Sequence, residues 1–260
     1  MKIIDCQKIR DKILDRETVK RLKGKTIHVV MQSRTGANNS YLKSIQRTAE
    51  QYGVMVKVYT MPIDKHHIVP KEDLDDVLRF EEPEQSNFVL FMGYEKYQIK
   101  YLVTASRKVN WEQVLDPPAA PDVVEAVNRI LEKALGKQYS EPWDAVIIGR
   151  SRLAKKMCAE LLENNYTVTM CHTQTKDIKA HCKRADIIIS FAGSPGLITT
   201  DMVKDRAVII SVGCSFIDGK IYGDIELDAM KCRTVSVTPT PGGVGQVCTA
   251  VMFETVAGNA

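Results

Sequence analysis

The stretch Asp144-Ala-Val-Ile-Ile-Gly-Arg-Ser151 decides the fold of the second half of this 260-residue chain. Its apolar run predicts a short strand, and Gly149 permits a tight turn directly after it. The segment 152–163 then has the pattern of a helix. A strand that ends in a glycine turn and opens a helix is typical of a Rossmann domain, because helix N–H groups meet a pyrophosphate there. Since a lone glycine is a weak signal, an ordinary strand–helix turn is the alternative.

Short strand-like runs alternate with helical runs along the whole chain. The expected strands are 26–31, 54–59, 87–92, 144–148, 167–171, 186–190, 207–212 and 234–237, and the expected helices between or after them are 38–52, 71–80, 123–135 and 152–163. Such alternation predicts an α/β fold built from parallel βαβ units. A proline-rich break at 116–122 separates two series. We therefore expect an N-terminal α/β domain of catalytic type over 1–120 and a C-terminal Rossmann-type NAD(P)-binding domain over 121–260. The final helix, about 246–257, is a candidate for packing back on the first domain.

Composition argues against several classes of protein. The net charge is only +4 and no basic run stands out, so we expect no nucleic-acid partner. No apolar stretch reaches the roughly 18 residues of a membrane span, and the polar N-terminus does not resemble a secretory signal. Seven scattered cysteines without a Cys-x-x-Cys pair predict a reduced, cytoplasmic protein. The pairs Cys171-His172 and His181-Cys182 match no zinc-ligand spacing, so no metal is expected.

The end of the second strand of the C-terminal domain bears on the choice of cofactor. An NAD site usually carries an acid there, which binds the ribose 2′-hydroxyl. This chain reads Thr169-Met-Cys-His-Thr-Gln-Thr-Lys176, without an acid. The guanidinium of Arg150 suits a 2′-phosphate instead, so NADP is favoured over NAD. Small residues in Ser190-Phe-Ala-Gly-Ser-Pro-Gly196, after the third strand, leave room for a ligand.

Taken in order, several segments resemble the methylenetetrahydrofolate dehydrogenase/cyclohydrolase family. They are Gly149-Arg-Ser151, Cys171-His-Thr-Gln-Thr175, Ser211-Val-Gly213, Gly223-Asp-Ile225 and, most specifically, Thr238-Pro-Thr-Pro-Gly-Gly-Val-Gly245. The resemblance implies hydride transfer from N5,N10-methylene-tetrahydrofolate to NAD(P), a folate substrate and a homodimer. The cofactor-binding residues expected from the turn and the resemblance are Gly149, Arg150, Ser151, Thr173, Gly193, Val212, Gly213, Cys214 and Gly245. The expected substrate-binding residues are Tyr41, Ile45, Met92, Gly242 and Gly243.

The first domain departs from the family's folate site. Tyr41 resembles the tyrosine of a Tyr-x-x-x-Lys motif, but the lysine, which carries the cyclohydrolase chemistry, falls on Ile45. An isoleucine cannot transfer a proton, so we expect the cyclohydrolase to be lost and assign no catalytic residue. The family's glutamine falls on Met92, its acid has Asn110 as the best match, and Pro-Cys-Thr-Pro becomes the segment 118–121. Tyr41 and Ile45 at i, i+4 are equally read as core contacts of an amphipathic helix.

Three hypotheses about function remain at the level of sequence. The first is an NADP-dependent methylenetetrahydrofolate dehydrogenase of one-carbon metabolism that lacks cyclohydrolase activity. It ranks first because the cofactor motifs and the diglycine loop are retained. The second is an oxidoreductase for a different, less polar substrate, and the third is a non-catalytic member that binds a nucleotide or a protein partner.

Overall fold

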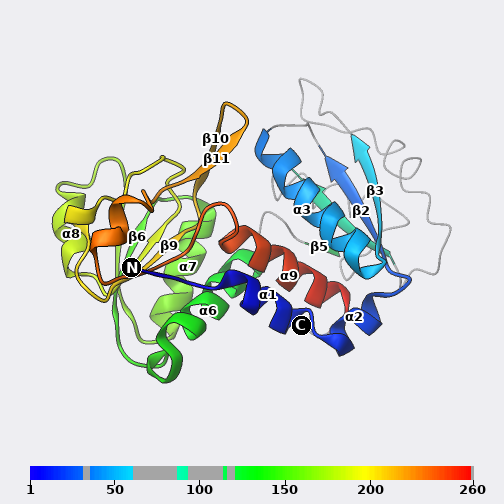
Figure 1. Cartoon of the computed structure of the whole chain (residues 1–260), viewed down its shortest axis with the longest axis horizontal. Coiled ribbons are helices and arrows are strands. Elements are labelled where there is room, and N and C mark those ends of the chain that lie inside the picture. Colours follow the sequence, from blue (N-terminus) through cyan, green and yellow to red (C-terminus); the bar gives the residue numbers. More distant parts are fainter. Residues whose placement is uncertain (32–35, 61–86, 93–113, 116–120, 259–260) are drawn as a thin grey trace. The chain divides into compact units, whose positions relative to one another are not determined.

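The structure is a computed structural model that describes residues 1–31, 36–60, 87–92, 114–115 and 121–258 (Figure 1). It divides into two compact units: unit 1 is Met1–Ile13 with Asp122–Val251, and unit 2 is Leu14–Pro121 with Met252–Ala260. The first residues of the chain thus group with its second half, whereas a boundary at 120 places them in the first domain. The helix expected over 71–80, Asn110 and residues 118–120 lie outside the described residues.

Unit 1 contains a six-stranded parallel sheet in the order β1-β12-β9-β8-β6-β7. The strands are β1 (Lys2–Ile3), β6 (Asp144–Ile148), β7 (Thr167–Cys171), β8 (Ile187–Ser190), β9 (Val208–Ser211) and β12 (Ser236–Val237). The middle strands β8 and β9 are buried along their whole length and are apolar up to the serine that ends each, as expected for a sheet covered on both faces. The chain runs from β6 to β7 on one side and returns to β8 on the other, so strand order reverses at β6. Ligands of open α/β sheets bind at such a reversal point.

Helices and a hairpin complete unit 1. They are α1 (Cys6–Ile13), α6 (Pro121–Leu135), α7 (Arg152–Glu163), α8 (Ile178–Arg184), α9 (Val244–Val256), the 3-10 helices η3 (Gly136–Gln138), η4 (Thr200–Met202) and η5 (Ala229–Cys232), and the antiparallel strands β10 (Cys214–Ile217) and β11 (Lys220–Gly223). The division between units falls within α9, whose last turns belong to unit 2. Helix α7 begins at the expected residue because Ser151 caps it, and its apolar face buries Ala154, Met157 and Leu161.

Unit 2 contains a four-stranded parallel sheet in the order β3-β2-β4-β5. Its elements are α2 (Arg16–Leu22), β2 (Thr26–Met31), α3 (Gly36–Tyr52), β3 (Met55–Thr60), β4 (Asn87–Met92) and β5 (Val114–Leu115). Every residue of β2 is buried, which fits its central place between β3 and β4. Gly53 takes a φ of +71° directly after α3, a conformation that favours glycine and ends the helix.

The predicted α/β class is confirmed, and the predicted strands of both halves match strands of the structure to within two residues. Helices α1, α2 and α8, the short strands β1 and β5 and the β10–β11 hairpin were not anticipated from the sequence. Among the described helices, none has the length and apolar character that a membrane crossing requires.

Candidate functional site

Most of the residues expected to bind the cofactor follow strands that end at one edge of the unit 1 sheet. Ile148 lies opposite Cys171 on β7 and opposite Ser190 on β8, and Ser190 lies opposite Ser211 on β9. The segments that leave these four strands therefore begin side by side. They contain Gly149, Arg150, Ser151, Thr173, Gly193, Val212, Gly213 and Cys214. We call this place the carboxyl edge.

The turn after β6 is shaped by Gly149. Its φ is +124°, and its N–H donates to the carbonyl oxygen of Cys171 at 2.8 Å. A Cβ at this position would lie 3.2 Å from the Cβ of Phe191, so the turn also depends on close packing. Ser151 Oγ accepts from the N–H of Ala154 at 3.2 Å and fixes the start of α7. The exposed Arg150 lies between a glycine turn and a helix N-terminus, which is favourable for an anion.

The segment after β7 forms a compact polar turn without an acid. The N–H of His172 donates to Thr175 Oγ1 at 2.9 Å, and the N–H of Thr175 donates to the carbonyl oxygen of His172 at 2.8 Å. His172 Nδ1 accepts from the N–H of Gln174 at 3.2 Å. Thr173 is exposed at the tip of this turn. The turn offers hydroxyl and N–H groups, and no carboxylate that would repel a phosphate.

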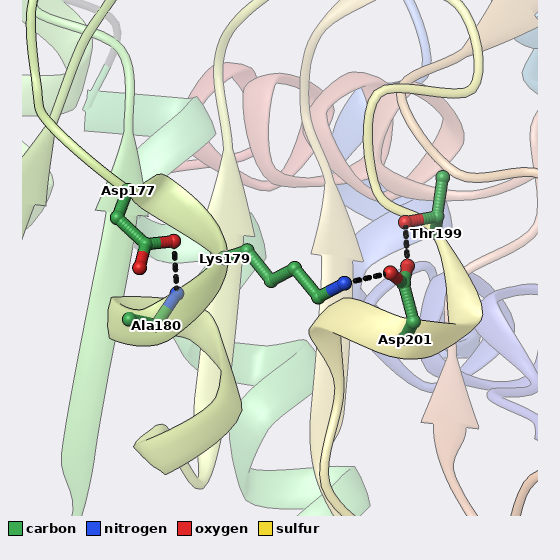
Figure 2. A network of polar contacts seen from close by, with 5 residues as sticks. All are labelled: Asp177, Lys179, Ala180, Thr199 and Asp201. Carbon is green, nitrogen blue, oxygen red and sulfur yellow. Dashed lines mark hydrogen bonds and ion pairs between the residues drawn. The ribbon is translucent and has the colours of Figure 1, made fainter.

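A surface ion pair links α8 to η4, as Figure 2 shows. Asp177 accepts from the N–H of Ala180 at 3.1 Å and caps α8, whereas Lys179 reaches across to the carboxylate of Asp201. Asp201 also accepts from Thr199 Oγ1 at 2.5 Å. The hydrogen bond from Lys179 is the main reason that the pKa of Asp201 falls to about 2, so this carboxylate is ionised at neutral pH. This ion pair connects η4, where the segment that follows β8 ends, to α8.

The glycine-rich segment 238–245 leads into α9, whose first two residues it includes, and packs closely against the rest of unit 1. A Cβ at Gly243 would overlap the carbonyl oxygen of Pro239, and a Cβ at Gly223 would lie 2.5 Å from Thr240 Oγ1. Gly242 is exposed with a φ of +89°, and Gly245 is exposed at the start of α9. This backbone can therefore approach a ligand without side chains in between.

Strand-end hydroxyl groups and a buried acid form a network that sequence analysis gave no role. Ser190, Ser211 and Thr238 close the ends of β8, β9 and β12, and all three are buried together with Asp224. The signals in the sequence are one small polar residue at the end of each apolar strand and the place of Ser211, Asp224 and Thr238 within the family-like segments. Cys214 begins β10 beside this network, and its side chain is exposed. Partial desolvation of its thiol by the surrounding protein, followed by the negative charge of Asp224, raises the pKa of this thiol. Cys214 is therefore a neutral thiol at physiological pH.

The predicted substrate residues of unit 2 are mostly interior. Ile45 has an exposed fraction of 0% and Met92 of 4%, so both contribute to the core of this unit. Tyr41 is half-buried on α3, and its hydroxyl group contacts the sulfur of Met252 at 3.8 Å. The core interpretation of the Tyr41 and Ile45 pair fits this burial for Ile45, and the substrate contacts stay predictions. Across the described ranges, no group of three or more His, Cys, Asp or Glu side chains is arranged to hold a metal ion.

Comparisons with known proteins point to one family, both for the second half of the chain and for nearly its whole length. The sequence model described as tetrahydrofolate dehydrogenase/cyclohydrolase, NAD(P)-binding domain, matches residues 121–260. The bifunctional protein FolD of Pseudothermotoga lettingae is 34% identical in an alignment that covers 99% of this chain and 97% of that protein. The chain belongs to the tetrahydrofolate dehydrogenase/cyclohydrolase family. The FolD of Francisella philomiragia is 31% identical over 84% of this chain and 82% of its own length.

The family likeness is strongest locally in some relatives. The FolD of Clostridium tetani is 40% identical over 153 residues, so that alignment spans 58% of this chain and about half, 53%, of the relative. Among solved structures, the FolD of Campylobacter jejuni covers 100% of this chain with a TM-score of 0.78 and 23% identity. The FolD of Trypanosoma brucei, solved with NADP and an inhibitor, covers 98% with a TM-score of 0.76 and 23% identity. These structures confirm the predicted two-domain fold with a Rossmann-type C-terminal part.

Proposed function

We propose that this member of the family is an NADP-dependent 5,10-methylenetetrahydrofolate dehydrogenase of one-carbon metabolism. The observation that carries the proposal is the Gly149–Arg150–Ser151 turn, which joins β6 to α7 where strand order reverses. Relatives aligned over nearly the whole chain are named as bifunctional FolD proteins. In our proposal the cofactor binds to unit 1, which contains most of residues 121–260. The folate binds to unit 2, which contains most of residues 1–120.

Several residues of the carboxyl edge and the glycine-rich segment have a distinct task in this proposal. Gly149 lets the pyrophosphate approach the backbone, and Arg150 pairs with the 2′-phosphate. NADP supplies the ring that accepts the hydride. Val212, Gly213 and Cys214 line the nicotinamide side, while Gly242 to Gly245 lie between cofactor and substrate. Because hydride transfer depends mainly on proximity and orientation, the dehydrogenase needs no proton donor at residue 45.

Loss of the cyclohydrolase is part of the proposal. Hydrolysis of a methenyl group requires a group that moves protons at the substrate, and Ile45 carries none. Its exposed fraction of 0% also keeps water from this position. Tyr41, one helical turn earlier and half-buried, remains the candidate for stacking on the substrate ring.

The test measures the two activities separately. Purified protein with methylene-tetrahydrofolate and NADP is expected to form NADPH, seen by its absorbance, with NAD clearly less effective. Methenyl-tetrahydrofolate is expected to disappear no faster with enzyme than in buffer. Absence of NADPH formation at high enzyme concentration would refute the dehydrogenase, and enzyme-dependent methenyl hydrolysis would refute its restriction to one activity.

We also propose that the chain forms a homodimer through the β10–β11 hairpin. This hairpin stands out from the sheet of unit 1 (Figure 1). It exposes Phe216, Ile217 and Tyr222 to extents of 51%, 45% and 42%. A lone two-stranded hairpin is at most marginally stable in water, so a second copy that covers these side chains would stabilise it. Light scattering is expected to give a dimer mass for the native chain and a monomer mass for Phe216→Asp; a monomeric native chain would refute the proposal.

A cytoplasmic location completes the proposal. All seven cysteines are free thiols, and Cys6, Cys171, Cys182 and Cys248 are buried. Free thiols persist in a reducing compartment. Localisation of a tagged chain in fractionated cells tests this, and recovery outside the cytoplasmic fraction would contradict it.

A further inference from the structure

Asp224 is a fully buried acid at the carboxyl edge, with an exposed fraction of 0%. It follows β11 directly. Its Oδ1 accepts from the N–H of Ser194 at 2.7 Å, and its Oδ2 accepts from the N–H of Ala192 at 3.1 Å and from Ser190 Oγ at 2.6 Å. A carboxylate removed from water is costly unless donors surround it. Here both backbone donors come from the segment 191–194 that follows β8, so the charge of Asp224 fixes the path of this segment.

Gly213 brings a second segment of the carboxyl edge onto the same acid. A Cβ on Gly213 would overlap Oδ2 of Asp224 and the backbone nitrogen of Gly193, and would lie 2.9 Å from the nitrogen of Ala192. Ser215 Oγ also donates to the carbonyl oxygen of Gly193 at 2.6 Å. The segments after β8 and after β9 therefore form one packed cluster around the Asp224 carboxylate.

The backbone of Asp224 is in turn fixed by hydrogen bonds with residues at the ends of β9 and β12. Its N–H donates to Ser211 Oγ at 2.9 Å, and the same hydroxyl group donates to the carbonyl oxygen of Gly213 at 3.0 Å. The N–H of Ser211 donates to Thr238 Oγ1 at 2.9 Å. The ends of β8, β9 and β12 are thus joined through Asp224 and the three hydroxyl groups of Ser190, Ser211 and Thr238. A network of this kind is rigid when every member is satisfied.

We propose that Asp224 is a positioning residue for the nicotinamide half of the cofactor, an inference that rests on the proposed function. In a doubly wound sheet the dinucleotide lies across the reversal point, with one half on each side. Arg150 and Thr173 lie on the β6–β7 side, which takes the phosphorylated adenosine. The segments that Asp224 holds lie on the β8–β9 side, which takes the nicotinamide. Asp224 is buried beneath them and acts through their backbone.

The deciding variant is Asp224→Asn, which keeps the shape of the side chain. Its amide nitrogen presents hydrogen atoms to a backbone N–H, so Ala192 or Ser194 loses its acceptor. Affinity for intact NADP is expected to fall about tenfold or more, the equivalent of one charge-assisted hydrogen bond. Adenosine 2′,5′-bisphosphate lacks the nicotinamide half of NADP. The variant is expected to bind it within about twofold of the native affinity, because the changed hydrogen bond lies far from the adenosine side of the site. Titration calorimetry with both ligands measures this difference.

Two controls separate positioning from general damage. Asp228→Asn removes an exposed carboxylate that pairs with Lys231 at 2.7 Å, and is expected to leave both affinities unchanged. Hydrogen exchange without ligand is expected to speed up at the amides of Ala192 and Ser194 in Asp224→Asn, but not in β6. If Asp224→Asn fails to fold, Ser190→Ala is the second variant. It removes one donor to Asp224 and a longer, 3.4 Å contact with the N–H of Ala192, and is expected to weaken NADP selectively.

Each outcome decides between distinct statements. The positioning role would be overturned if Asp224→Asn bound NADP as tightly as the native chain does. It would also be overturned if the variant lost affinity equally for NADP and for the bisphosphate and its β6 amides exchanged faster. A native chain that binds the bisphosphate without gaining affinity from the nicotinamide half would overturn it as well, while leaving the site around Arg150 intact. A native chain that binds neither ligand would overturn the proposed function, and the positioning role with it.

Discussion

Gly213→Ala should be among the most damaging single-methyl additions in unit 1. The added Cβ would overlap Asp224 Oδ2 and the nitrogen of Gly193, and its third neighbour, the nitrogen of Ala192, would be 2.9 Å away where ordinary contact needs at least 3.4 Å. All three neighbours are held by hydrogen bonds or the backbone. Overpacking costs about 1–3 kcal/mol, and losing one hydrogen bond to a buried carboxylate costs roughly 1.5–3 kcal/mol. We expect a total loss of about 3–5 kcal/mol in the free energy of unfolding.

Urea denaturation followed by circular dichroism measures this loss. Gly245→Ala is the matched control, because it adds the same methyl group in unit 1 where nothing lies within 4 Å of the new atom. It sits in a helix, so alanine is expected to leave stability unchanged or raise it by about 0.4–1 kcal/mol. A Gly213→Ala variant that unfolds within about 1 kcal/mol of the native chain would show that the cluster around Asp224 yields easily.

Three further predictions address the cofactor, the core and the thiols. Arg150→Ala should weaken NADP binding about 10- to 100-fold and NAD binding far less, in a titration of both, because a charge-assisted contact with the 2′-phosphate is lost; equal losses would disprove the assignment. Ile45→Ala should lower the free energy of unfolding by about 2–5 kcal/mol, since Ile45 has an exposed fraction of 0%; a loss below about 1 kcal/mol in urea denaturation would instead indicate a site that is open to solvent. Burial raises the pKa of Cys6 and of Cys182 to about 12, so their thiolates are scarce at pH 8. A thiol reagent should therefore label the exposed Cys232 well before either of them, and peptide mapping that finds fast labelling of Cys182 would contradict its burial.

Local sequence patterns predicted the strands of both units well. In the strand 144–148 an uninterrupted apolar run, 145–148, follows Asp144, and Ser151 marks the start of α7 by its own hydroxyl group. These signals act within a few residues, so they survive in the sequence alone. The hairpin 214–223 escaped prediction because Cys-Ser-Phe-Ile is short and its turn, Asp218-Gly219, is not flanked by a clear alternation.

The sequence by itself determined the α/β class, the turn at Gly149 and the absence of an acid after β7, because each depends on residues that are neighbours in the chain. Only the tertiary structure decided that Asp224 is buried beneath the segments after β8 and β9. Its partners Ser190 and Ser194 lie 34 and 30 positions away in the chain. The parallel pairing of Ser190 with Ser211, together with the return of the β10–β11 hairpin, brings them together. The spacing of residues in the sequence does not reveal the register of Ser190 with Ser211. That register is set by packing between strands, and the local preferences of a segment do not determine which strands pair.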